Sequence, residues 1–141
     1  MLGRWPNTQL YKYPRMSDAD TNLWRLWFAK YGIAYDRYDY DYPVGSGVDP
    51  GPDYSELLRK DYIELTRKRI DAIGYTGNQA TIFEIKPRAG TTALGQLLTY
   101  KRLFTAQYKE FPVVNLSVIT GLMTDEEKEI YSAHNIQIFV V

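Results

Sequence analysis

Two carboxylates and an ammonium group stand at a spacing that could hold a hard divalent cation. Glu84 and Lys86 lie in residues 80–86, a run rich in β-branched and aromatic side chains that is typical of a strand. Because side chains alternate between the faces of a strand, Glu84 and Lys86 project to the same side. Asp71 belongs to the preceding run of this kind, residues 69–75.

The segment between these runs predicts how they are arranged. Residues 76–78 are Thr-Gly-Asn, which are turn formers, so the runs are expected to pair as an antiparallel hairpin. The hairpin can bring Asp71 opposite Glu84. Two carboxylates and the Lys86 ammonium would then share one face of a small sheet. Such a group can hold Mg²⁺ or Mn²⁺ and position a water beside it.

These residues resemble the restriction-endonuclease-like PD-(D/E)XK superfamily of metal-dependent nucleases. Its signature is an Asp at the end of one strand and Glu-x-Lys on the next, followed, particularly in the RecB-like branch, by a helix with Gln-x-x-x-Tyr. The matching residues here are Asp71, Glu84, Lys86, Gln96 and Tyr100. The resemblance covers roughly residues 67–104. The sequence departs from it in two places: Ile70 stands where Pro is common, and the first helix has no acidic residue in its body.

The resemblance implies a role for each matching residue. Asp71 and Glu84 would bind the cation, with the carbonyl of Ile85 as a third ligand. Lys86 would orient or help deprotonate the attacking water, or stabilise charge on the phosphate. Gln96 would reach back toward this site, and Tyr100 lies one helical turn further along the same face.

Basic residues near the motif are candidates for holding the phosphate backbone of DNA. They are Arg67, Lys68, Arg69, Arg88, Lys101 and Arg102. For residues 67–69, a solvated strand edge is an alternative interpretation. The chain has 17 basic and 17 acidic residues, so its net charge is zero. Any contact with nucleic acid must therefore come from local clusters rather than from a global field.

The surrounding pattern predicts an α/β domain with a central mixed sheet flanked by helices. We expect a helix from the N-cap Ser17 to residue 31, a strand over 33–44 and a Gly/Pro loop over 45–52. Residues 54–66 are ambiguous, with a helical turn at 55–58 and the start of a strand at Tyr62. A helix capped by Thr91 or Thr92 follows, with an apolar side at Leu94, Leu97, Leu98 and Leu103. A strand over 112–120, a helix opening at Thr124 and a strand over 136–141 complete an α-β-β-β-α-β core with a terminal α-β unit.

The chain is divided into an extended aromatic arm, residues 1–16, and one PD-(D/E)XK-like domain, residues 17–141. The arm has no periodicity, so it needs large side chains to tie it down. We expect it to bury Trp5, Tyr11 or Tyr13 against another protein subunit, in a homo-oligomer or a viral assembly.

Composition limits the remaining possibilities. The absence of Cys excludes a disulfide framework and thiolate metal sites. No apolar run is long enough to span a membrane, and no signal-peptide pattern is present, so a cytoplasmic location is expected, or a virion if the protein is phage-encoded. The leading hypothesis is a Mg²⁺- or Mn²⁺-dependent endo- or exodeoxyribonuclease. The alternative is a catalytically silent structural or adaptor protein on the same fold, such as a phage virion component or head-completion protein.

Overall fold

Six strands form one mixed sheet with four α-helices in residues 2–141, the part of the chain that the computed structural model describes. Met1, the first residue of the predicted arm, lies outside these residues. The strands are β1 (Trp5–Pro6), β2 (Arg37–Val44), β3 (Lys68–Thr76), β4 (Gln79–Arg88), β5 (Val113–Leu122) and β6 (Ile136–Val140). The helices are α1 (Asp18–Tyr31), α2 (Glu56–Thr66), α3 (Thr91–Gln107) and α4 (Asp125–Ala133), and a 3₁₀ turn, η1 (Gly32–Ala34), follows α1.

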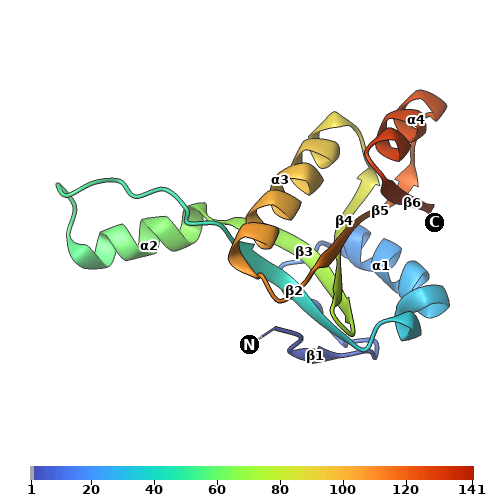
Figure 1. Cartoon of the computed structure of the whole chain (residues 1–141), viewed down its shortest axis with the longest axis horizontal. Coiled ribbons are helices and arrows are strands. Elements are labelled where there is room, and N and C mark those ends of the chain that lie inside the picture. The colour runs from blue at the N-terminus through green and yellow to red at the C-terminus, as the bar shows by residue number, and fades with distance from the viewer. Residues whose placement is uncertain (1) are drawn as a thin grey trace.

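The strands lie in chain order across the sheet, which gives it an antiparallel half and a parallel half. Strands β1 to β4 pair as antiparallel neighbours, whereas β4, β5 and β6 run parallel to one another. Parallel neighbours need a long crossover, and helices α3 and α4 provide the two that are required. Figure 1 shows α1 and α3 on opposite faces of the sheet. The α/β class with a central mixed sheet is confirmed.

Each face of the sheet carries its own hydrophobic core. Trp24, Trp27 and other aromatic side chains pack under α1, and Phe83 of β4 lies among them. On the other face, Leu97 of α3 packs in a cluster that includes Ile82. Consecutive strand residues therefore face different cores, as side-chain alternation requires. This alternation fixes the face on which each polar residue of β4 emerges.

Three of the four α-helices in residues 2–141, α1, α2 and α4, begin with a side-chain cap from the residue before them. The hydroxyl of Ser17 accepts a hydrogen bond from the Asp20 N–H at 3.1 Å, and Thr124 forms a reciprocal capping box with Glu127. Helix α3 differs, because Gly90 is its N-cap and makes no side-chain bond. The prediction that Thr91 or Thr92 caps α3 is therefore wrong. So is part of the predicted apolar side, since Leu98 is exposed.

The N-terminal arm packs on the domain of its own chain. Strand β1 pairs with β2, and the Gly3 N–H donates to the buried carboxylate of Asp39 at 2.7 Å. Tyr13 is fully buried in the core under α1, and Trp5 packs against that core. The expectation that Tyr13 is buried against another subunit is wrong, because its own domain covers it. For Trp5, which is half-buried, and for Tyr11, which is fully exposed, the expectation stays a prediction.

Helix α2 is the main departure from the predicted order of elements. Residues 56–66 are one helix, so the expected strand start at Tyr62 is wrong. Ser55 caps it by accepting a hydrogen bond from the Leu58 N–H at 3.2 Å. Figure 1 shows α2 and the loop before it projecting away from the sheet. No residue of α2 is buried.

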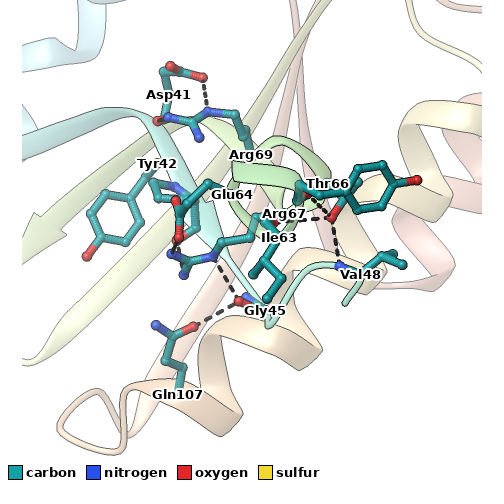
Figure 2. A network of polar contacts seen from close by, with 12 residues as sticks. Asp41, Tyr42, Gly45, Val48, Ile63, Glu64, Thr66, Arg67, Arg69 and Gln107 are labelled. Atoms are coloured by element: carbon teal, nitrogen blue, oxygen red, sulfur yellow. Dashed lines mark hydrogen bonds and ion pairs between the residues drawn. The ribbon is translucent and has the colours of Figure 1, made fainter. Parts of the chain in front are cut away.

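Polar contacts hold the base of this projection, as Figure 2 shows. The Arg67 guanidinium donates to the carbonyl of Gly45 at 2.9 Å and to that of Pro43 at 3.3 Å. The Thr66 hydroxyl accepts from the Val48 N–H at 2.7 Å. These bonds tie the two chain segments of the base together, so the projection leaves the sheet in a defined direction.

No helix within residues 2–141 has the length and apolar character needed to cross a bilayer.

Candidate functional site

The candidate site lies at a fork between β3 and β4. Pairing of the two strands ends at Ala72 and Phe83, and the next two residues are Asp71 and Glu84. Beyond the fork, β3 continues along β2 and β4 continues along β5. The Ile85 N–H donates to the Asp71 carboxylate at 2.9 Å, in place of a backbone bond between the strands. The predicted hairpin is confirmed, and it places both carboxyl groups where the strands separate.

The carboxyl groups of Asp71, which is half-buried, and Glu84, which is buried, lie within hydrogen-bonding reach of each other. Glu84 is only 2% exposed. Burial raises the pKa of Glu84 far above its usual range, and the charge of Asp71 raises it further. Burial also raises the pKa of Asp71, although its bonds to Glu84 and to the Ile85 N–H act in the opposite direction. Burial and the neighbouring Asp71 carboxylate therefore favour the protonated form of Glu84.

Lys86 emerges on the same face of β4 as Glu84. Phe83 and Ile85, which alternate with these residues, have their side chains in the core under α1. Glu84 and Lys86 therefore face the α3 side. The positive charge of Lys86 acts to lower the pKa of both Asp71 and Glu84, although within residues 2–141 its ammonium group forms no ion pair with either.

Helix α3 brings Tyr100 and Gln96 to the same region. Tyr100 is buried, and after burial itself the charges of Glu84 and Asp71 are the largest causes that raise its pKa. The Gln96 side chain lies against the Tyr100 hydroxyl. Its Oε1 atom is buried and has no hydrogen-bond partner within residues 2–141. Such an orphaned acceptor needs a donor, and a bound water is one that would satisfy it.

Asp20 is a member of this site that sequence reasoning missed. It lies in the first turn of α1, where an acidic residue is expected to interact with the helix dipole. In the structure it is half-buried and lines a small hollow with Asp71 and Asp41. Burial is the largest cause of the raised pKa of Asp20, and the charge of Asp71 adds to it. No local signal separates such a residue from an ordinary helix-start aspartate.

The predicted DNA-contacting residues are spread over several elements. Arg67 donates to backbone carbonyls of the loop before α2, and Arg69 pairs with Asp41 at 2.8 Å. Arg88 pairs with Glu127 at 2.8 Å. Lys101 and Arg102 are exposed on α3 and take part in no ion pair formed within residues 2–141. Lys68 is likewise exposed and takes part in no ion pair within these residues. Internal partners therefore occupy three of the six candidate groups, those of Arg67, Arg69 and Arg88.

The donor set fits a cation held by few protein oxygens. Residues 2–141 contain no group of three or more His, Cys, Asp or Glu side chains arranged around one point. Two carboxylates at a fork suit Mg²⁺ or Mn²⁺, which keep several waters and need no complete protein cage. A cation would also take the place of the proton that Glu84 carries. Ile85, whose carbonyl is the expected third ligand, is fixed to Asp71 through its N–H.

Comparison of the chain with protein-family models, with curated proteins and with solved structures found no match. Function is therefore inferred from the geometry of the fork.

Proposed function

We propose that this protein is a metal-dependent nuclease that hydrolyses phosphodiester bonds of DNA. The observation that carries the proposal is the Asp71–Glu84 carboxyl pair at the fork, with Glu84 buried, Asp71 half-buried and the charge of Lys86 acting on both. The order of elements supports a restriction-endonuclease-like core. A helix precedes an antiparallel meander (β2, β3, β4), and α3 then leads to β5, parallel to β4.

Asp71 and Glu84 bind the cation through their carboxylate oxygens. Glu84 must release its proton when this happens, so binding is coupled to pH. A bound Mg²⁺ or Mn²⁺ ion supplies positive charge beside the scissile phosphate and makes a nearby water more acidic. The fork holds Asp71 rigidly, because its carboxylate is already bonded to the Ile85 N–H.

The remaining residues act on the water and the phosphate. Lys86 orients the attacking water and stabilises the charge that develops on the phosphate oxygens. The Oε1 atom of Gln96 accepts a hydrogen bond from a water, which satisfies an otherwise unpaired buried acceptor. Tyr100 is buried, its hydroxyl contacts the Gln96 side chain, and it holds Gln96 in place beside the site. Hydrolysis joins the water oxygen to phosphorus and breaks one phosphorus–oxygen ester bond.

Contacts to the DNA backbone come from local basic residues, because the net charge is zero. Lys101 and Arg102 on α3 are the exposed candidates, and Arg88 can exchange Glu127 for a phosphate. Arg67 and Arg69 would contribute positive potential from their internal positions.

A second candidate function is a catalytically silent structural or adaptor protein of a larger assembly. The observation that favours it is the exposed apolar surface of the α2 projection, combined with the absence of net charge. A structural or adaptor protein would have no use for the carboxyl pair of Asp71 and Glu84 at the fork.

The test is a cleavage assay on linear and circular duplex DNA and on single strands, with Mg²⁺ or Mn²⁺. We expect cleavage by the wild type, loss of at least a hundredfold in Glu84→Gln and Lys86→Met, and no change in the exposed control Glu110→Gln. The linear and circular substrates separate exonuclease from endonuclease action. Folded wild-type protein that cleaves none of these substrates, or activity that Glu84→Gln retains, would reject the nuclease in favour of the adaptor.

A further inference from the structure

The α2 projection carries an apolar surface that no other part of residues 2–141 covers. Six large side chains of residues 48–65 are exposed, each by between 47% and 77%. They are Val48, Tyr54, Leu57, Leu58, Tyr62 and Leu65. Leu58, Tyr62 and Leu65 recur at the i, i+4, i+7 spacing of an apolar helix stripe. Such a stripe normally faces a core, but here it faces solvent.

A short helix in this situation lacks the packing that usually stabilises one. Helix α2 spans 11 residues and buries none of them, and isolated helices of this length are marginal in water. Its base is fixed by Arg67 and Thr66 (Figure 2), and the helix projects away from the sheet (Figure 1). The missing packing must therefore come from another molecule.

We infer that α2 and the loop before it form a homodimer interface, with the occupant being the same surface of a second copy. The area is the first argument. Large apolar side chains bury on the order of 100–200 Å² each. At the observed exposures, the six contribute roughly 400–600 Å² of apolar surface on each copy. A standard interface buries about 800 Å² per partner, of which about 60% is apolar. The exposed patch thus matches what a stable dimer requires.

Charge is the second argument. Helix α2 carries three acidic residues (Glu56, Asp61, Glu64) and two basic ones (Arg59, Lys60), so its own charge is −1. With both signs of charge and a net charge of −1, helix α2 does not attract a phosphate backbone, and it does not attract a strongly charged protein. It suits a copy of itself, because both signs occur on one surface and can be exchanged across a twofold axis.

The two arguments give a specific arrangement. In an antiparallel pairing with the twofold axis between Asp61 and Tyr62, Leu58 of one copy lies opposite Leu65 of the other. The same register places Arg59 opposite Glu64, beside the ion pairs that they make with Asp49 and Arg67 of their own copy. A hollow of about 420 Å³ beside the helix, lined in part by Val48 and Leu58, has room for apolar side chains of the partner. The inference is independent of the nuclease proposal, since no residue of the fork is involved.

The experiment is sedimentation of the full chain over a micromolar concentration series, with two matched variants. Leu65→Glu places a charge in the proposed interface, and Ile33→Glu makes the same change at an exposed position of η1. We expect the wild type and Ile33→Glu to dimerise alike, and Leu65→Glu to raise the dissociation constant at least tenfold. A monomeric wild type at all concentrations, or a Leu65→Glu variant that dimerises as well as wild type, would overturn the inference.

Cross-linking adds a readout of geometry, because the chain has no cysteine of its own. Tyr62→Cys lies next to the proposed axis, and mild oxidation should join it to its counterpart in the second copy. Ile33→Cys should stay monomeric on a non-reducing gel under the same conditions. Equal cross-linking of the two variants would show that contact is random and would overturn the proposed register.

Discussion

Replacing Glu84 with glutamine should change how the stability of the metal-free protein depends on pH. The folded-state pKa of Glu84 lies far above its usual value of about 4.5 because of burial first and the charge of Asp71 second. The folded chain therefore holds a proton that the unfolded chain releases. The stabilisation that comes from this proton is fully present below about pH 4.5, and it is lost as the pH rises toward the folded-state pKa of Glu84.

The size of the effect follows from proton linkage. One proton bound only by the folded state costs about 1.4 kcal/mol of unfolding free energy for each pH unit. Between pH 5 and pH 8, Glu84 alone should remove up to about 4 kcal/mol, a large share of the roughly 5–15 kcal/mol that stabilises a typical domain. Glutamine has the shape of the protonated acid and does not ionise, so Glu84→Gln should escape this loss.

The assay is urea unfolding of wild type and Glu84→Gln in a chelator, at pH 5 and at pH 8. We expect similar stability at pH 5 and a more stable variant at pH 8. The exposed Glu110→Gln variant controls for loss of a carboxylate as such and should follow the wild type. At pH 8, added Mn²⁺ should raise the unfolding free energy of the wild type but should leave that of Glu84→Gln unchanged. Parallel pH profiles for wild type and Glu84→Gln would refute the claim that Glu84 holds a proton in the folded state.

Two further predictions concern the face of the sheet that α1 covers. Asp20→Asn should weaken Mn²⁺ binding by about 10–100-fold, measured as the shift in melting temperature on titration, because it removes a charge close to Asp71. Unchanged affinity would place Asp20 outside the site. Trp24→Ala should cost about 3–5 kcal/mol in urea unfolding, since Trp24 is fully buried and packs against Trp27 and Phe83. A loss below 1 kcal/mol would mean that the aromatic cluster is not the core of that face.

Local signals were sufficient to predict the hairpin and most of the helices. The Thr-Gly-Asn turn at residues 76–78 and the strand patterns on both sides of it set the register that brings Asp71 opposite Glu84. The expected strand over 33–44 starts only at Arg37, because Gly32–Ala34 continues from α1 as a 3₁₀ turn. In both the hairpin and the 3₁₀ turn, the hydrogen bonds that determine the structure join residues that are close in sequence.

Two kinds of prediction failed. In the arm, contacts with residues far away in the sequence determine the structure, and in residues 62–65 a composition that favours strands wrongly predicts a strand. The arm is held by Asp39, 36 residues from Gly3, and no pattern within residues 1–16 reveals that partner. Residues 62–65 favour a strand by composition, but the Ser55 cap and the charges at helical spacing in residues 56–64 determine the structure. Asp20 was missed because the same position serves an ordinary helix start.

The carboxyl pair at the fork is difficult to explain as a stabilising feature. Ile73 and Ile82 belong to the core on the face that α3 covers and lie two residues from Asp71 and Glu84 along β3 and β4. A pair of apolar residues of similar size at positions 71 and 84 would extend the apolar run of each strand. Buried ionisable groups are commonly neutral or unfavourable for stability compared with such replacements. Breaks of this kind in an otherwise consistent core are expected at functional sites. A silent adaptor would gain from losing the pair, whereas a cation-dependent nuclease cannot work without it, so the pair favours the enzyme.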